Sequence, residues 1–77
     1  MNQQSKPLFS HRLNRVEVAV WQNQNETSKW HNITFQKSYR DAAGNLQTTA
    51  SLLMDDLPSV SFLAGQAYHF LAGLEAE

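Results

Sequence analysis

The sequence predicts an α+β fold: an antiparallel β-meander of three strands, or four if residues 7–13 also form one, followed by one C-terminal α-helix. Two observations predict it. The first two-thirds of the chain alternates apolar and polar residues, with polar tracts between the alternating runs. The last third repeats apolar residues at helical spacing. A chain of 77 residues is one domain, which we expect over residues 9–77 after a flexible polar tail of residues 1–8.

The first strand is expected over residues 14–22. There Val16, Val18 and Val20 share one parity, and β-branched residues with period two are typical of a half-buried strand. The polar tract 23–28 that follows predicts a hairpin turn.

Two further strands are expected over residues 29–40 and 46–53. The first of them places Ile33 and Phe35 on one parity, which we assign to the face of the valines. Residues 41–45 between them predict a turn, whose glycine suits a positive φ.

The helix is expected over about residues 56–74. Asp55 or Asp56 can cap its first amide groups, and Pro58 is tolerated in a first turn. One apolar stripe runs along it, made of Leu57, Val60, Ala64, Ala67, Leu71 and Leu74.

Other apolar residues widen this stripe beyond what one sheet face needs. A helix that is apolar nearly all round is buried on more than one side. We therefore expect a homodimer with the helix at its interface; the alternative is a monomer with an exposed apolar patch. The expected interface residues are Leu63, Ala67, Phe70, Leu71 and Leu74.

Charge is divided along the chain. All six Lys and Arg residues lie in the first forty positions, which hold only two acids, whereas the remainder holds five acids and no Lys or Arg. The basic part is also the expected sheet and contains Trp21 and Trp30. A basic, aromatic-bearing sheet backed by an acidic helix is typical of an electrostatic groove for single-stranded nucleic acid.

The helix-free sheet face is the expected binding surface. Indoles would stack on bases, cations would contact phosphates, and neutral polar side chains would form hydrogen bonds. Alternatively, Trp21 and Trp30 pack on each other across a hairpin. Lys37 has the parity of the buried face, so a bulge or the wet end of the strand must free its ammonium group. The expected nucleic-acid-binding residues are Arg15, Trp21, Lys29, Trp30, Asn32, Thr34, Gln36, Lys37 and Arg40.

Other classes of function are disfavoured. The chain has no Cys, its three His residues lack metal-ligand spacing, and no nucleophile or phosphate-loop motif occurs. We expect no metal, no cofactor and no catalytic activity. No apolar segment is long enough to span a bilayer and no signal peptide is evident, so we expect a cytoplasmic protein without membrane contact.

Three stretches resemble a family of small, mostly uncharacterised bacterial proteins: residues 18–23, residues 32–41 and Asp55-Asp56-Leu57-Pro58. Its pattern is a V-W-x-N strand, an N-V-T-F-x-R-S-Y-K-D strand, a Thr-rich strand, then D-D-L-P opening an Ala-rich helix. The resemblance covers about residues 12–72. In layout the chain is more distantly similar to single-stranded-DNA-binding domains of the transcriptional coactivator and Whirly type. That similarity implies a dimer binding single strands across its sheets.

Two functions follow as expectations. The first is binding of single-stranded nucleic acid, more specifically DNA, without strong sequence specificity. The alternative is a small adaptor or inhibitor of phage or plasmid type, in which the acidic helix end meets a basic protein partner.

Overall fold

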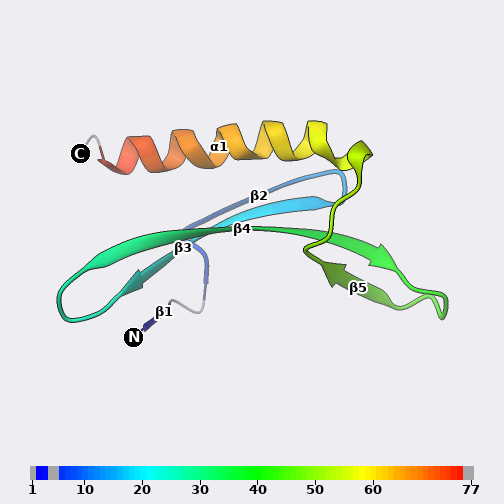
Figure 1. The fold of residues 1–77 in the computed structure, drawn as a ribbon, viewed down its shortest axis with the longest axis horizontal. Coiled ribbons are helices and arrows are strands. Elements are labelled where there is room, and N and C mark those ends of the chain that lie inside the picture. The colour runs from blue at the N-terminus through cyan, green and yellow to red at the C-terminus, as the bar shows by residue number, and fades with distance from the viewer. Residues whose placement is uncertain (1, 4–5, 76–77) are drawn as a thin grey trace.

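The chain folds into two layers, an arched antiparallel sheet and one helix that lies along it (Figure 1). The computed structural model describes residues 2–3 and 6–75. The order of elements is β1 (Asn2–Gln3), β2 (Phe9–Leu13), β3 (Val16–Gln24), β4 (Lys29–Arg40), β5 (Leu46–Thr49), a 3₁₀ turn η1 (Met54–Asp56) and α1 (Leu57–Glu75).

Strands β2 to β5 form a meander in which every pairing is antiparallel, and β1 adds two residues to the edge of β3 beyond β2. The predicted α+β meander with a C-terminal helix is therefore confirmed, with residues 9–13 as the fourth strand. Asn2 and Gln3, expected in a polar tail, pair with Asn23 and Gln24 of β3. The rest of that tail is described only from Lys6 onward.

The strand boundaries follow from local turn chemistry. β3 begins at Val16, not residue 14, because Asn14 turns the chain at φ 59°, which an Asn side chain tolerates. β4 has the predicted bounds. The turn after it is held by Asp41, whose carboxylate accepts the backbone N–H groups of Ala43 and Asn45. As predicted, Gly44 there has a positive φ of 86°.

β5 is shorter than the predicted strand 46–53. It ends at Thr49, whose hydroxyl accepts the N–H of Ser51, and the chain then turns toward the helix. Helix α1 starts one residue later than predicted, after η1. Asp56 accepts the N–H of Leu53, the residue before η1, and not one of the first amide groups of the helix that this acidic pair was expected to cap.

The core is small and lies between β3 and α1. Val16, Val18 and Val20 of β3 meet Leu63 and Ala67 of α1, and all five side chains are buried. The helix packs on β2 and β3, and the rings of Phe9 and Phe70 stack with centroids 4.9 Å apart. The helix lies over β2 and β3, so on β4 part of the same sheet face remains open, with Ile33 44% exposed.

The helix is tied to the sheet by two polar contacts. Lys37 Nζ of β4 lies 2.9 Å from Asp56 Oδ2, and both side chains are only 14% exposed. At the same end of the helix, the amide of Asn14 donates to the hydroxyl of buried Ser59. Within the described part of the chain, no helix has the length and apolar character needed to cross a membrane.

Candidate nucleic-acid interface

The sheet face without a helix is concave and largely polar. Figure 1 shows β4 bowed so that its middle lies nearest α1 and its ends fall away on the opposite side. Strand parity and register place on this face two indoles, a row of neutral polar side chains and several charges. These residues are Arg12, Glu17, Ala19, Trp21, Trp30, Asn32, Thr34, Gln36, Ser38 and Arg40.

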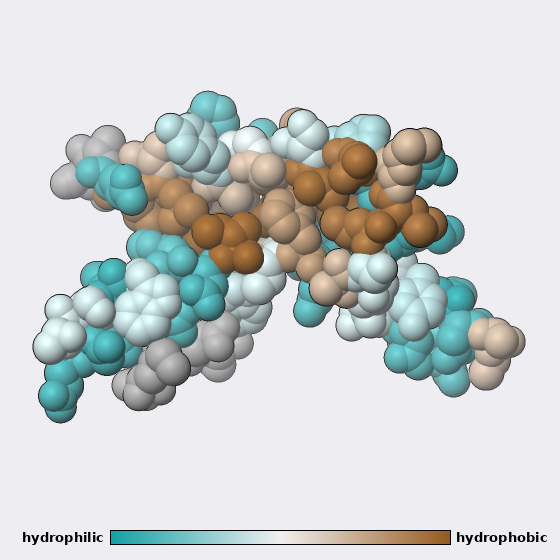
Figure 2. Space-filling view, viewed as in Figure 1, coloured by the Kyte–Doolittle hydropathy of each residue, from teal (hydrophilic) through white to brown (hydrophobic). Residues whose placement is uncertain are grey.

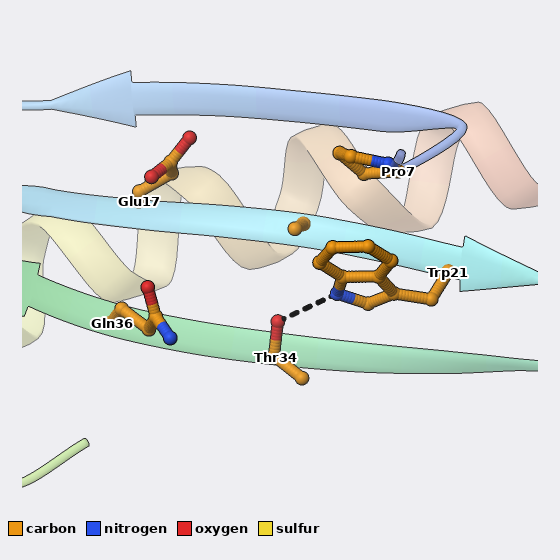
Figure 3. Close-up of a pocket in the computed structure, with 6 residues that line it drawn as sticks. Pro7, Glu17, Trp21, Thr34 and Gln36 are labelled. Atoms are coloured by element: carbon orange, nitrogen blue, oxygen red, sulfur yellow. Dashed lines mark hydrogen bonds between the residues drawn. The ribbon is translucent and has the colours of Figure 1, made fainter. Parts of the chain in front are cut away.

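Trp21 does not stand upright on the sheet. Its Nε1–H donates to Thr34 Oγ1 on β4 at 3.0 Å, so the indole leans across the strands beside Ala19 (Figure 3). The side chain is half-buried. The indole N–H is therefore satisfied within the chain, while part of the ring remains accessible for stacking.

The register settles the relation between the two tryptophans. Trp21 pairs with Asn32, and Trp30 pairs with Asn23, so the indoles are diagonal neighbours on one face. Trp21 leans toward Thr34, which lies on the side of Asn32 away from Trp30. Among the described residues, the aromatic ring contacts do not include this pair. The expectation that the two rings pack on each other is thus not supported.

Lys37 is not available to a ligand on this face. The continuous pairing of β3 with β4 contains no bulge, and Lys37 lies on the helix side, opposite Val16. Its ammonium group forms the ion pair with Asp56 described above. The expectation that a bulge or wet strand end frees Lys37 for phosphate contact is wrong, because a carboxylate from the helix start neutralises it in place.

The other cations lie toward the ends of the sheet. Arg15, in the β2–β3 turn, and Arg40, at the end of β4, line one hollow of about 320 Å³ together with Ser38, Tyr39 and Leu46. Arg40 Nη1 also donates to the carbonyl of Gly44. Lys29 is exposed at the opposite end of β4, with the parity of the helix side. The predicted cations therefore flank the indoles and do not form one continuous stripe.

Two charged residues that are not among the predicted binding residues also belong to this face. Arg12 Nη2 of β2 lies 3.4 Å from Glu17 Oε1 of β3, an exposed and long contact. Period-two parity alone places Glu17 on the face of Trp21. Arg12 is not among the predicted binding residues because apolar and polar residues alternate only weakly in β2.

The predicted dimer-interface residues differ in how far they are buried. Leu63 is fully buried against the chain's own sheet and offers no surface to a partner, and Ala67 is 3% exposed. Phe70 and Leu71 are half-buried beside this core. Leu74 remains 39% exposed.

An apolar groove runs instead between α1 and β4. Its volume is about 260 Å³, and Ile33, which is 44% exposed, lies in its β4 wall. Figure 2 shows hydrophobic atoms along the junction of the helix and the sheet. The groove is lined by Ile33, Phe35, Ala64, Ala67, Tyr68 and Leu71.

Comparison with known proteins adds no relative: no family model, no curated protein and no solved structure matches this chain. Among residues 2–3 and 6–75, no three His, Asp or Glu side chains gather as a metal site would require.

Proposed function

We propose that this protein binds single-stranded nucleic acid, DNA in particular, along the concave helix-free face of its sheet. The observation that carries the proposal is the presence of two partly accessible indoles on one hollowed face, with arginines at one end. Every base has a π-face, so such a surface accepts a single strand with little dependence on sequence. A duplex would not expose its bases to the indoles.

Each group on the face has a distinct role in this proposal. Trp21 and Trp30 stack on bases, and Asn32 and Gln36 are exposed amides that hydrogen-bond to base edges. The hollow between Arg15 and Arg40 takes backbone phosphate, for which two guanidinium groups are suited. The remaining residues of the proposal are Thr34, which already accepts the Trp21 N–H, and Lys29, which has the parity of the helix side and would meet phosphate at the exposed end of β4.

We further propose that the active form is a homodimer joined through the groove between α1 and β4. The chain exposes 5767 Å² of surface, whereas a compact monomer of 8.8 kDa exposes about 4,800 Å². The excess is about the area that one partner buries in a standard interface, ~800 Å². The groove is apolar and borders an uncovered stretch of sheet, as an isologous contact between copies requires.

Titration of a fluorescein-labelled single strand of about ten nucleotides, followed by polarisation, tests the binding proposal. Trp30→Ala should weaken binding by about tenfold, because one base loses its stacking partner. Phe62→Ala, an exposed aromatic truncation on the helix, serves as the matched control. Equal affinities of the two variants would reject stacking on this face.

Salt dependence provides an independent test. Three phosphate contacts, by Arg15, Lys29 and Arg40, predict a slope of log K against log salt of about −2, and Arg40→Ala should reduce its size by about 0.7. Binding of labelled single strand that does not change with salt would contradict the assignment of these cations.

A second candidate function is binding of a protein partner. Two observations support it. The ion pair with Asp56 removes Lys37 from the cations that could contact phosphate. Three apolar side chains at the acidic start of the helix are more than half exposed, those of Leu53, Met54 and Leu57. Leu57→Ser leaves the concave face unchanged. If the protein retains a partner from nuclease-treated lysate and Leu57→Ser abolishes that retention while Trp30→Ala does not, the adaptor function is favoured.

A further inference from the structure

A hollow of about 220 Å³ lies on the concave face beside the Trp21 indole. It exists because Ala19 has a short side chain between two long ones on β3, those of Glu17 and Trp21. Pro7 lies on the β2 side of the hollow, and Thr34 and Gln36 form its β4 side. The hollow is thus bounded by an aromatic ring at one end and by hydrogen-bonding groups at the other.

The hydrogen-bonding groups of the hollow are unequal. Glu17 carries a carboxylate, which only accepts hydrogen bonds, and it is paired in register with Gln36, whose amide both donates and accepts. The contact of Glu17 with Arg12 is a long one of 3.4 Å between exposed side chains, so it competes weakly with a ligand. Thr34 Oγ1 already accepts the indole N–H. The hollow therefore favours a ligand with two adjacent donors for the carboxylate and an acceptor for the amide.

A carboxylate on a nucleic-acid-binding surface repels phosphate and so weakens binding. The carboxylate contributes to binding if a base donates hydrogen bonds to it, as bases do to Glu and Asp. Guanine presents N1–H and N2–H₂ as two adjacent donors on its Watson–Crick edge, next to the O6 acceptor. Cytosine and adenine offer one amino group beside a ring acceptor, and thymine offers one N–H between two carbonyl oxygens.

We propose that the hollow beside Trp21 is a base-specific subsite that prefers guanine, with Glu17 accepting from N1–H and N2–H₂ and Gln36 donating to O6. This inference rests on the proposed binding of single strands and adds one position of base preference to it. The Trp21 indole stacks on the bound base, and the short side chain of Ala19 at the bottom of the hollow leaves room for that base.

The test compares two labelled strands of equal length, one of thymidine alone and one with a single central guanosine. The guanosine strand should bind about tenfold more tightly, as expected for one bidentate base contact. Glu17→Gln should remove this ratio while it retains or improves binding of the thymidine strand. Glu26→Gln, which removes the same charge in the exposed β3–β4 turn, is the matched control and should keep the ratio.

Ala19→Val gives a second measurement that does not change charge. The added methyl groups enter the hollow, so the ratio should fall toward one, while β-branched Val suits a strand and the variant should still fold. Equal binding of the two strands by the native protein overturns the subsite alone. An unchanged ratio in Glu17→Gln also overturns it, whereas failure of both strands to bind overturns the proposed function together with this subsite.

Discussion

At the scale of single residues, one hydrogen bond sets the orientation of an indole. Trp21 donates to Thr34 across the β3–β4 pair, on the diagonal away from Trp30. The small side chain of Ala19, which pairs with Thr34, leaves room for the ring to lean this way. Among the described residues, this is the only hydrogen bond of the indole. Without it the ring is free to change orientation, and the wall that the ring forms beside the hollow is no longer fixed.

We predict that Thr34→Val destabilises the protein by about 0.5–1 kcal/mol, because the substitution keeps the shape of the side chain and removes the acceptor. Urea denaturation measures this. Thr48→Val, also exposed in a strand, is the matched control for the gain in strand propensity. If Thr34→Val proves no less stable than Thr48→Val, the bond does not constrain Trp21.

At the scale of elements, one carboxylate joins the start of the helix to β4. The Asp56 carboxylate accepts hydrogen bonds from the ammonium group of Lys37 on β4 and from the backbone N–H of Leu53, just before η1. The ion pair with Lys37, and next the Leu53 N–H, lower the pKa of Asp56 below its ordinary 3.8. The contact closes the end of the core at which the helix begins, so its loss frees the helix start from β4.

The lowered pKa of Asp56 predicts acid sensitivity. Its stabilising effect is complete above the ordinary pKa of 3.8 and is lost as pH falls through the lower pKa of the folded state. The melting temperature of the native protein should therefore fall on acidification from about pH 5. Asp56→Asn should melt lower at neutral pH and lose less on acidification.

Two features make this experiment interpretable. Asp55→Asn, a neighbouring exposed residue in η1, is the matched control and should follow the native acid curve. Asp41 also has a lowered pKa, chiefly through the backbone N–H of Asn45, and adds the same acid loss to every variant. Parallel curves for Asp56→Asn and the native protein would show that the ion pair does not stabilise the fold.

The strands and the helix start also show which features of the fold the sequence predicts. The valines of β3 revealed their face because strands repeat every two residues, and the second strand was bounded correctly by its polar flanks. The strand at residues 9–13 was uncertain because only Phe9 and Leu13 of its inward positions are apolar, with His11 between them. The partner of Lys37 was missed because Asp56 approaches it only through the packing of the helix on the sheet.

The binding face was predicted in part for a related reason. Parity alone assigned Trp21, Trp30 and Asn32 to one side, and the structure agrees. Which way an indole leans depends on its neighbours across the strands, and these require the register. The pairing of Arg15 with Arg40 around one hollow likewise requires the order of strands, which brings the β2–β3 turn beside the end of β4.

At the scale of the whole molecule, the shape is more open than that of a compact domain of this length. The radius of gyration is 14.4 Å, against about 11.5 Å for a compact domain of 77 residues. The helix spans β2 and β3 and leaves an apolar margin at β4. A second copy that fills the groove on this margin would bury exposed Ile33 and Tyr68 and leave the concave face open.

We therefore predict a dimer in solution that one groove substitution separates. Ala64 is exposed and lines the groove, so Ala64→Arg places a long cation there without entering the core of the chain. Sedimentation equilibrium should give twice 8.8 kDa for the native protein and 8.8 kDa for this variant. His69→Arg, an exposed change on the same helix outside the groove, should remain dimeric.

A native protein that sediments as a monomer at all concentrations, or an Ala64→Arg variant that stays dimeric, would show that the groove does not join two copies. Because the groove and the concave face lie on opposite sides of the sheet, a monomeric Ala64→Arg should still bind a short single strand, with lower affinity only for strands long enough to reach both copies.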